Sequence, residues 1–227
     1  LGASTITDDK ESEFVQIADQ AVVQALSADQ IESALAGLRG DIQQVPSSVS
    51  AIKVDGQRAY AKVRSGDEVK LEARPVTIKR FEIIGEPRIV VDGTNTFLDF
   101  EAVIDCTSGT YIRALARDLG SALNVGGHLT ALRRTKIGNY SVAQAQSLTD
   151  LTAEDLVVMP IAEAARAQFA ARELSERDAT DLRHGKRLRA ELEGEAPIAA
   201  YSPDGALVAM LTRSGKDLKS LVVFNDA

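Results

Sequence analysis

Several residue types are scarce in this chain of 227 residues, and each scarcity excludes a class of protein. The one cysteine, Cys106, cannot form an internal disulfide, and no group of Cys and His residues has the spacing of a zinc site. No run of 18 apolar residues could span a membrane, and no basic start followed by an apolar stretch predicts a secretion signal. We therefore expect a cytoplasmic protein without structural metal, whose core forms from its 44% hydrophobic residues.

Charge is unevenly distributed along the chain. The 26 Lys and Arg residues against 33 Asp and Glu residues give a net charge of −7, which argues against binding nucleic acid over the whole surface. Residues 52–88, however, carry nine basic and six acidic residues, and residues 106–140 carry five basic residues and one acidic residue. Either these two basic segments bind an anionic partner or they form an ordinary solvated surface.

Apolar residues at helical spacing predict helices, and alternating stretches between turn residues predict strands. Residues 85–96 contain Gly85 and Pro87 and are predicted to be a loose connection. The predicted helices cover residues 27–40, 57–65, 111–123 and 175–184. The predicted strands cover residues 14–17, 51–54, 76–84, 97–106, 198–201, 207–212 and 218–224, and residues 129–142 are predicted to be extended. The three strands predicted over residues 198–224 indicate a small β-rich domain.

Arg113 is unusual because it lies in the first turn of a predicted helix. The segment before it reads as the end of a strand followed by a tight turn at Ser108-Gly109. A helix N-terminus carries partial positive charge, so an arginine there costs roughly 0.3–1 kcal/mol unless an anion compensates it. We therefore expect a carboxylate or a phosphate beside Arg113. An ordinary arginine–aspartate pair without a catalytic role satisfies the same pattern.

Four blocks of the sequence resemble the bacterial tRNA pseudouridine-55 synthase family (tRNA pseudouridine synthase B), in its actinobacterial form. The resemblance covers about residues 1–145, and the C-terminal part is similar, more weakly, to the PUA-like tail of the family. The blocks are residues 1–9 (LGASTITDD), residues 45–53 (VPSSVSAIK) with 72–75 (EARP), residues 108–113 (SGTYIR) with 118–120 (DLG), and residues 126–135 (GGHLTALRRT).

The resemblance implies an α+β pseudouridine synthase fold, which is a mixed, mainly antiparallel sheet flanked by helices, with a C-terminal PUA-like β-rich domain. We expect an N-terminally incomplete catalytic domain over residues 1–160, with a thumb-like insertion at about 46–80, and an RNA-binding PUA-like domain over residues 165–227. Members of the family isomerise uridine 55 in the T-arm loop of tRNA to pseudouridine without cofactor or metal. The expected partner is therefore tRNA, bound by a monomer that has no membrane contact.

The resemblance also implies roles for individual residues. Arg113 pairs with the catalytic aspartate, Tyr111 contacts the substrate, and Leu132 provides an apolar contact beside the base. The target uridine lies inside a folded loop and must be flipped out, at an unstacking cost of a few kcal/mol. The residues expected to contact RNA phosphates are Lys53, Arg58, Lys62, Arg64, Lys70, Arg74, Arg133 and Arg134.

One motif of the family is missing from these residues. The catalytic aspartate of the family lies in a Gly-x-Leu-Asp-Pro motif upstream of the strand that matches Leu1 onward, and no Leu-Asp-Pro occurs in this sequence. Asp8 and Asp9 match a later turn and are not expected to be the nucleophile. We therefore expect the nucleophile to lie upstream of Leu1 and this chain alone to be inactive. The alternatives are a non-catalytic tRNA-binding or tRNA-folding module and a related isomerase that acts on another RNA.

Overall fold

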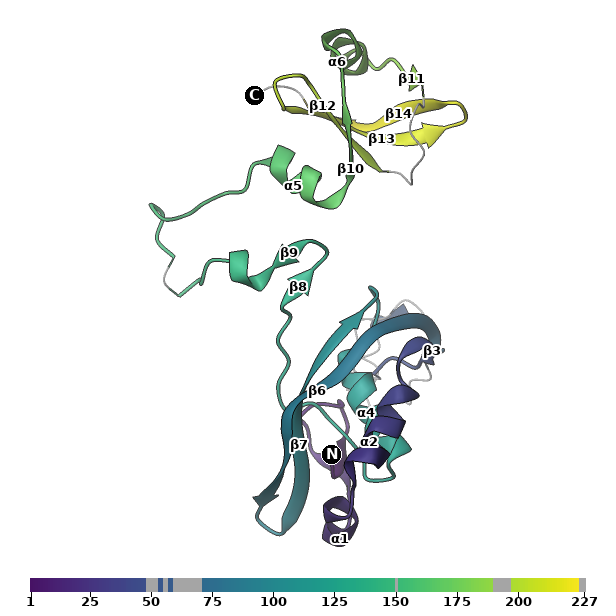
Figure 1. Cartoon of the computed structure of the whole chain (residues 1–227), viewed down its shortest axis with the longest axis vertical. Coiled ribbons are helices and arrows are strands. Elements are labelled where there is room, and N and C mark those ends of the chain that lie inside the picture. Colours follow the sequence, from purple (N-terminus) through teal and green to yellow (C-terminus); the bar gives the residue numbers. More distant parts are fainter. Residues whose placement is uncertain (48–52, 55–56, 59–70, 150, 190–196, 225–227) are drawn as a thin grey trace. The chain divides into compact units, whose positions relative to one another are not determined.

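The computed structural model describes residues 1–47, 53–54, 57–58, 71–149, 151–189 and 197–224 (Figure 1). The chain divides into two compact units, Leu1–Leu132 and Arg133–Ala227, each with its own sheet and its own buried hydrophobic residues. No helix in the described ranges is long and apolar enough to cross a membrane. The predicted domain limits, 1–160 and 165–227, stay a prediction, because a division by compactness does not say which residues serve catalysis.

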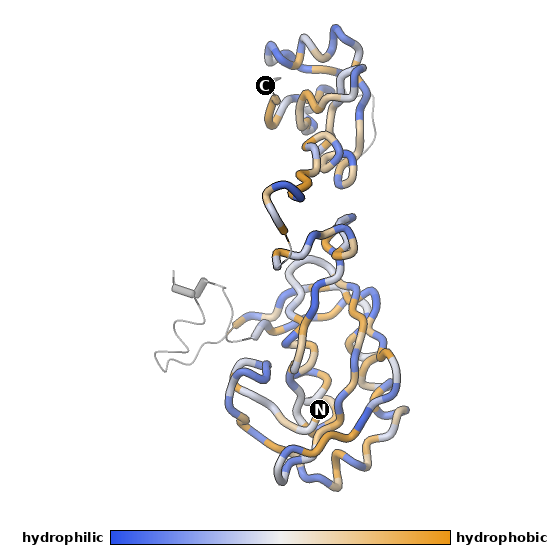
Figure 2. Tube along the Cα trace, turned by 90° about the vertical axis from the view of Figure 1, so that its left-hand side faces the viewer, coloured by the Kyte–Doolittle hydropathy of each residue, from blue (hydrophilic) through white to orange (hydrophobic). Residues whose placement is uncertain are grey.

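The first unit is built on a three-stranded antiparallel sheet with the strand order β3-β6-β7. Helices α2 and α4 lie on one face of the β6–β7 hairpin (Figure 1), where Leu35, Leu115 and Leu119 pack against Ile78 and Phe81. Near the start of β6, Val76 and Ile78 are buried and Thr77 between them is only partly covered, as expected for a sheet with one covered face, and Figure 2 shows hydrophobic and hydrophilic residues mixed along the trace of this unit. The elements of this unit are β1 (Ala3–Thr5), β2 (Phe14–Ile17), α1 (Gln20–Gln24), α2 (Ala28–Ala36), β3 (Gly40–Gln44), β4 (Lys53–Val54), β5 (Gln57–Arg58), β6 (Arg74–Asp92), β7 (Asn95–Cys106) and α4 (Ile112–Ala122).

The prediction of a loose connection over residues 85–96 was wrong. Strand β6 runs continuously through most of this segment and turns directly into β7. The register changes so that the four steps from Ile84 to Arg88 on β6 lie opposite the two steps from Glu101 to Asp99 on β7. This irregularity accommodates Gly85, with φ +71°, and Pro87, so residues that favour turns are tolerated within a strand.

Two of the helices predicted in the first unit are confirmed. Helix α2 begins with a capping box, in which the Gln30 N–H donates to Ser27 Oγ at 3.2 Å and the Ser27 N–H donates to Gln30 Oε1 at 2.9 Å. Helix α4 occupies the range predicted around Arg113. The helix predicted over residues 57–65 is contradicted at its start, because Gln57–Arg58 is strand β5 and pairs with β4; residues 59–65 lie outside the described residues.

The second unit contains a five-stranded sheet with the order β10-β12-β13-β14-β11. β10 pairs parallel to β12, and the other pairs are antiparallel. Arg172 Nη1 on edge strand β10 donates to the carbonyl oxygen of Arg189 on edge strand β11 at 2.9 Å, so this side chain links the two edges of the sheet. The three strands predicted over residues 198–224 and the helix over 175–184 are confirmed. The elements are β8 (Lys136–Ile137), β9 (Tyr140–Ser141), a 3-10 turn (Val142–Gln144), α5 (Ile161–Gln168), β10 (Ala170–Glu173), α6 (Glu176–Arg183), β11 (Leu188–Arg189), β12 (Ile198–Tyr201), β13 (Leu207–Ser214) and β14 (Asp217–Val223).

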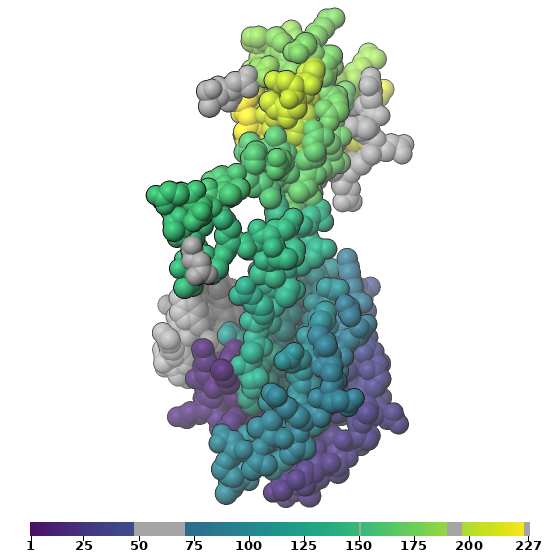
Figure 3. All heavy atoms as spheres, turned by 60° about the vertical axis from the view of Figure 1, so that its left-hand side comes forward, coloured from purple at the N-terminus to yellow at the C-terminus, as the bar shows by residue number. Residues whose placement is uncertain are grey.

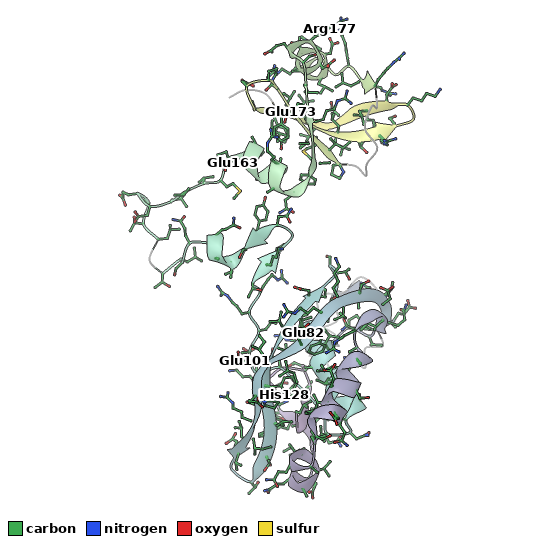
Figure 4. The ribbon with its side chains drawn as sticks, viewed as in Figure 1. Glu82, Glu101, His128, Glu163, Glu173 and Arg177 are labelled. Carbon is green, nitrogen blue, oxygen red and sulfur yellow. The ribbon has the colours of Figure 1, made fainter. Side chains whose placement is uncertain are left out.

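Helices α5 and α6 pack against two different hydrophobic clusters of this sheet. Leu182 of α6 belongs to the larger cluster, and Ala165 of α5 packs with Tyr201. The Tyr201 hydroxyl donates to the carbonyl oxygen of Ala162 at 3.1 Å, and the guanidinium of Arg166 lies over its ring. Figure 4 shows Glu163 on α5, Glu173 on β10 and Arg177 on α6 projecting from this unit. Charged side chains therefore surround its apolar interior.

Candidate functional site

A buried glutamine fixes the start of helix α4. Gln44, at the end of β3, is 2% exposed. Its Oε1 accepts a hydrogen bond from the backbone N–H of Tyr111 at 2.8 Å, and its Nε2 donates to the carbonyl oxygen of Tyr111 at 3.1 Å. Tyr111 is the N-cap residue of α4 and makes no side-chain capping bond. The amide of Gln44 therefore positions the backbone from which the side chains of Tyr111 and Arg113 project.

The anion that the sequence predicts beside Arg113 is Asp9. Arg113 Nε donates to Asp9 Oδ2 at 2.7 Å, and the two side chains are 42% and 16% exposed. Within the part of the chain that the structure describes, the terminal nitrogens of Arg113 have no hydrogen-bond partner. An exposed guanidinium with one edge bound and the other edge available can accept a second anion.

The turn that carries Asp9 is held on both sides by backbone hydrogen bonds to Leu129. The Lys10 N–H donates to the carbonyl oxygen of Leu129 at 2.8 Å, and the Leu129 N–H donates to that of Asp8 at 3.0 Å. Figure 3 shows the N-terminal residues beside the chain near residue 130 in the first unit. Leu132 follows three residues later with 61% of its surface exposed. Tyr111 and Arg113, two of the three residues predicted to form the substrate site, thus lie at the start of one helix. The third, Leu132, lies three residues after Leu129, which bonds to the turn that carries Asp9.

Close backbone packing places residues 126–129 against α4. A Cβ added to Gly120 would lie 2.0 Å from the carbonyl carbon of Gly126, and one added to Gly127 would lie 2.2 Å from the carbonyl oxygen of Ala116. Only glycine permits this approach. His128 (labelled in Figure 4) bonds through Nδ1 to the carbonyl oxygen of Ala3 at 3.0 Å.

A second cluster of charges lies behind the Asp9 turn. Asp8 is 6% exposed, and its Oδ2 lies 3.4 Å from Arg117 Nη1. Burial raises the pKa of the Asp8 carboxyl above its usual value, while the charge of Arg117 and a hydrogen bond from Ser47 oppose that rise. Arg117 also bonds to Asp118 at 2.8 Å. Asp8 is therefore an ionisable group in a protected position directly beside the partner of Arg113.

The residues predicted to contact RNA lie in different parts of the chain. Arg74 is exposed at the start of β6, opposite Gln44, and Lys53 and Arg58 pair with each other across β4 and β5. Arg133 and Arg134 are exposed and lie outside any strand, in the segment that was predicted to be extended. Lys62, Arg64 and Lys70 lie outside the described residues.

The outward face of the β6–β7 hairpin carries acidic side chains. Glu82 and Glu101 project from it (Figure 4), and Glu82 pairs with Arg80 at 2.7 Å. Among the described residues no group of three or more His, Cys, Asp and Glu side chains could hold a metal ion.

Three protein-family models together match almost the whole chain. Residues 1–112 match the TruB family pseudouridylate synthase (N terminal domain), residues 113–165 the tRNA pseudouridylate synthase B C-terminal domain, and residues 169–225 the tRNA Pseudouridine synthase II, C terminal. The tRNA pseudouridine synthase B of Arthrobacter sp. (strain FB24) is 50% identical over 99% of this chain and 74% of its own length. The chain belongs to the TruB family. The resemblance found in the sequence is thereby confirmed.

Other TruB family members and more distant structures agree with this assignment. The tRNA pseudouridine synthase B of Streptomyces griseus is 45% identical over 99% of this chain and 74% of its own length. A crystal structure of a Cbf5-Nop10-Gar1 complex contains a chain that superposes with a TM-score of 0.60 at 19% identity, over 87% of this chain and 62% of that one. This similarity shows the fold alone. The predicted α+β pseudouridine synthase fold with a C-terminal PUA-like domain is confirmed.

Sequence reasoning missed four residues of this candidate site. Gln44, Ser47 and Arg117 were given no role, and Asp9 was excluded as a nucleophile without being recognised as the partner of Arg113. The helix-start argument predicted an anion there but not which residue supplies it. Asp9 lies 104 residues before Arg113, and no local pattern joins the two.

Proposed function

We propose that this chain is the part of a tRNA pseudouridine synthase that binds the T arm of tRNA and provides the arginine of the active site, for isomerisation of uridine 55. The observation that carries the proposal is the position of Arg113: it lies on the SGTYIR segment of a TruB chain, with one edge of its guanidinium bound to Asp9. The relatives named tRNA pseudouridine synthase B support the substrate class.

Arg113 would hold the catalytic aspartate ionised and in place. A guanidinium favours the charged form of an adjacent carboxylate, and its fixed fork sets the direction from which the carboxylate approaches. Asp9, which is mostly buried, binds Nε and so prevents the side chain from rotating away. Tyr111 and Leu132 would form walls for the flipped base, whose contact offsets part of the cost of unstacking.

The nucleophile itself is proposed to lie outside these 227 residues. No Leu-Asp-Pro occurs in the sequence, Asp9 lies in the turn of the TITDD segment and not in that motif, and Asp8 is buried beside Arg117. We therefore expect the purified chain to bind unmodified tRNA but to release no tritium from uridine labelled at carbon 5. Turnover by the purified chain would refute the upstream nucleophile.

Binding and catalysis can be tested separately. A protein extended upstream to include a Leu-Asp-Pro motif is expected to form pseudouridine, and its Arg113→Lys variant is expected to lose most of its turnover while keeping its affinity for tRNA. If the extended wild-type protein binds tRNA without isomerising any uridine, the chain is instead a tRNA-binding or tRNA-folding module. Competition with T-arm minihelices distinguishes tRNA from other RNA substrates.

The basic segments give a second test of RNA binding. Reversing charge at Arg58 and Arg74 is expected to weaken binding and to lower the dependence of log Kd on log salt by about one for each phosphate that the variant no longer binds. Arg80→Glu is the matched control, because Arg80 is an exposed arginine that is already paired with Glu82. Equal effects at all three positions would mean that only net charge matters.

A further inference from the structure

Arg117 joins three parts of the first unit through one guanidinium. Its Nη1 lies 3.4 Å from Asp8 Oδ2, its Nη2 lies 2.8 Å from Asp118 Oδ1, and Nη2 also donates to the carbonyl oxygen of Val45 at 2.7 Å. Asp8 belongs to the turn after β1, Asp118 to helix α4, and Val45 to the segment after β3. The side chain is 26% exposed, so these bonds form in a largely protected setting.

The segment after β3 is held by several neighbouring residues. Gln44 binds the backbone of Tyr111, Arg117 binds Val45, and Ser47 Oγ donates to the carbonyl oxygen of Thr7 at 3.4 Å. Ser47 is 1% exposed, and the same hydroxyl also lies beside the Asp8 carboxyl, so its one proton serves either Thr7 or Asp8. These bonds run in two directions, toward the start of α4 and toward the turn that carries Asp9. Arg117 lies at their junction.

Asp8 adopts a conformation that is costly for an isolated residue. Its φ is +59°, which is uncommon for residues other than glycine although aspartate tolerates it better than most. Its carboxylate is also withdrawn from water, which disfavours the charged form. Two unfavourable features persist in one residue only where the surrounding contacts hold it, and such residues concentrate at functional sites.

We propose that Arg117 is a positioning residue that fixes the Asp9 turn and the segment after β3 relative to Tyr111 and Arg113. The planar fork of arginine can bond to Asp8, Asp118 and Val45 at set angles, whereas the point charge of lysine cannot. The site is then ordered before RNA arrives, so less freedom is lost on binding. The inference rests on the proposed function for its effect on RNA, but the positioning itself is independent of RNA.

The test compares Arg117→Lys and Asp8→Asn with the matched control Arg80→Lys. Lysine keeps the charge of residue 117 and removes the fork. Asparagine tolerates a positive φ and removes the buried charge, so the Asp8→Asn variant is expected to fold. Affinity of the full 227-residue chain for a fluorescent T-arm minihelix is expected to fall about fivefold or more in both variants and not in the control.

Two further readouts separate positioning from other roles. The slope of log Kd against log salt should stay at the wild-type value, since removal of a bond to phosphate would lower it by about one. Amide hydrogen exchange of Tyr111 and Lys10, whose N–H groups donate to Gln44 and Leu129, should become about tenfold faster without RNA in Arg117→Lys and stay unchanged in Arg80→Lys.

Each outcome decides the proposal. Wild-type exchange in Arg117→Lys overturns the positioning role, whether or not the chain binds RNA. Wild-type affinity in both variants, or a lower affinity with a lower salt slope, also overturns it. Failure of the wild-type chain to bind the minihelix overturns the proposed function, and the exchange measurement then still tests the positioning.

Discussion

Replacement of Gly120 by alanine tests whether close backbone packing holds the active-site elements together. The added Cβ would lie 2.0 Å from the carbonyl carbon of Gly126 and 2.1 Å from the nitrogen of Gly127, whereas ordinary contact begins at 3.4 Å. Helix α4 or the chain at 126–127 must therefore move by about 1.4 Å, the difference between 3.4 and 2.0 Å. Both neighbours are backbone, so no side-chain rotation relieves the clash.

The expected cost is about 3 kcal/mol, at the upper end for overpacking of a rigid interior. It should lower the melting temperature of the first unit by about 10 °C, followed by circular dichroism. Gly37→Ala is the matched control, because Gly37 has a helical φ of −70° and its added Cβ would meet only one atom, at 3.5 Å. That variant should melt at or slightly above the wild-type temperature.

A Gly120→Ala protein that melts with the wild type would refute the packing argument. An equal loss in both glycine variants would also refute it, since the cost would then come from glycine replacement in general. Because residues 126–129 contact the Asp9 turn, Gly120→Ala is expected to weaken minihelix binding as well, measured well below its melting temperature.

Two further predictions concern Asp8 and the cap of α2. Burial raises the folded pKa of Asp8, so the contribution of Asp8 to stability is fully present below its unfolded pKa and is lost as pH rises through the folded value. The free energy of unfolding of Asp8→Asn, measured in urea, should therefore increase relative to that of the wild type from about pH 3 to about pH 7. A difference that stays constant with pH would contradict the burial argument. Ser27→Ala removes the acceptor of the Gln30 N–H and should lower the free energy of unfolding by about 1 kcal/mol in the same assay. Ser33→Ala, on the exposed face of α2, is the control. An equal loss of stability in both variants would contradict the capping role.

Local patterns predicted those parts of the fold that local interactions determine. Apolar residues at helical spacing predicted α2 and α4, because that spacing depends on neighbours within a few residues. The segment at Gly85 and Pro87 was misread because pairing with β7 holds it in a strand against its local preference. The pattern of a single segment does not indicate which distant strand will pair with it.

The candidate site was predicted in part. An uncompensated arginine at a helix start required an anion, and the structure provides Asp9. The Asp8–Arg117 contact spans 109 residues and has no counterpart in spacing or periodicity, so the sequence alone could not indicate it. The SGTYIR segment identified the family but said nothing about Gln44, which holds that segment through backbone atoms only.

Gln44 holds Tyr111 through its backbone and not through its side chain. Both bonds go to the backbone N–H and carbonyl oxygen, which every residue except proline possesses, and the phenol ring takes no part in them. The fold therefore places no demand of its own on this ring through the cap. A substitution series at residue 111 would therefore leave the bonds to Gln44 in place, so its effects would report on the contacts of the ring itself.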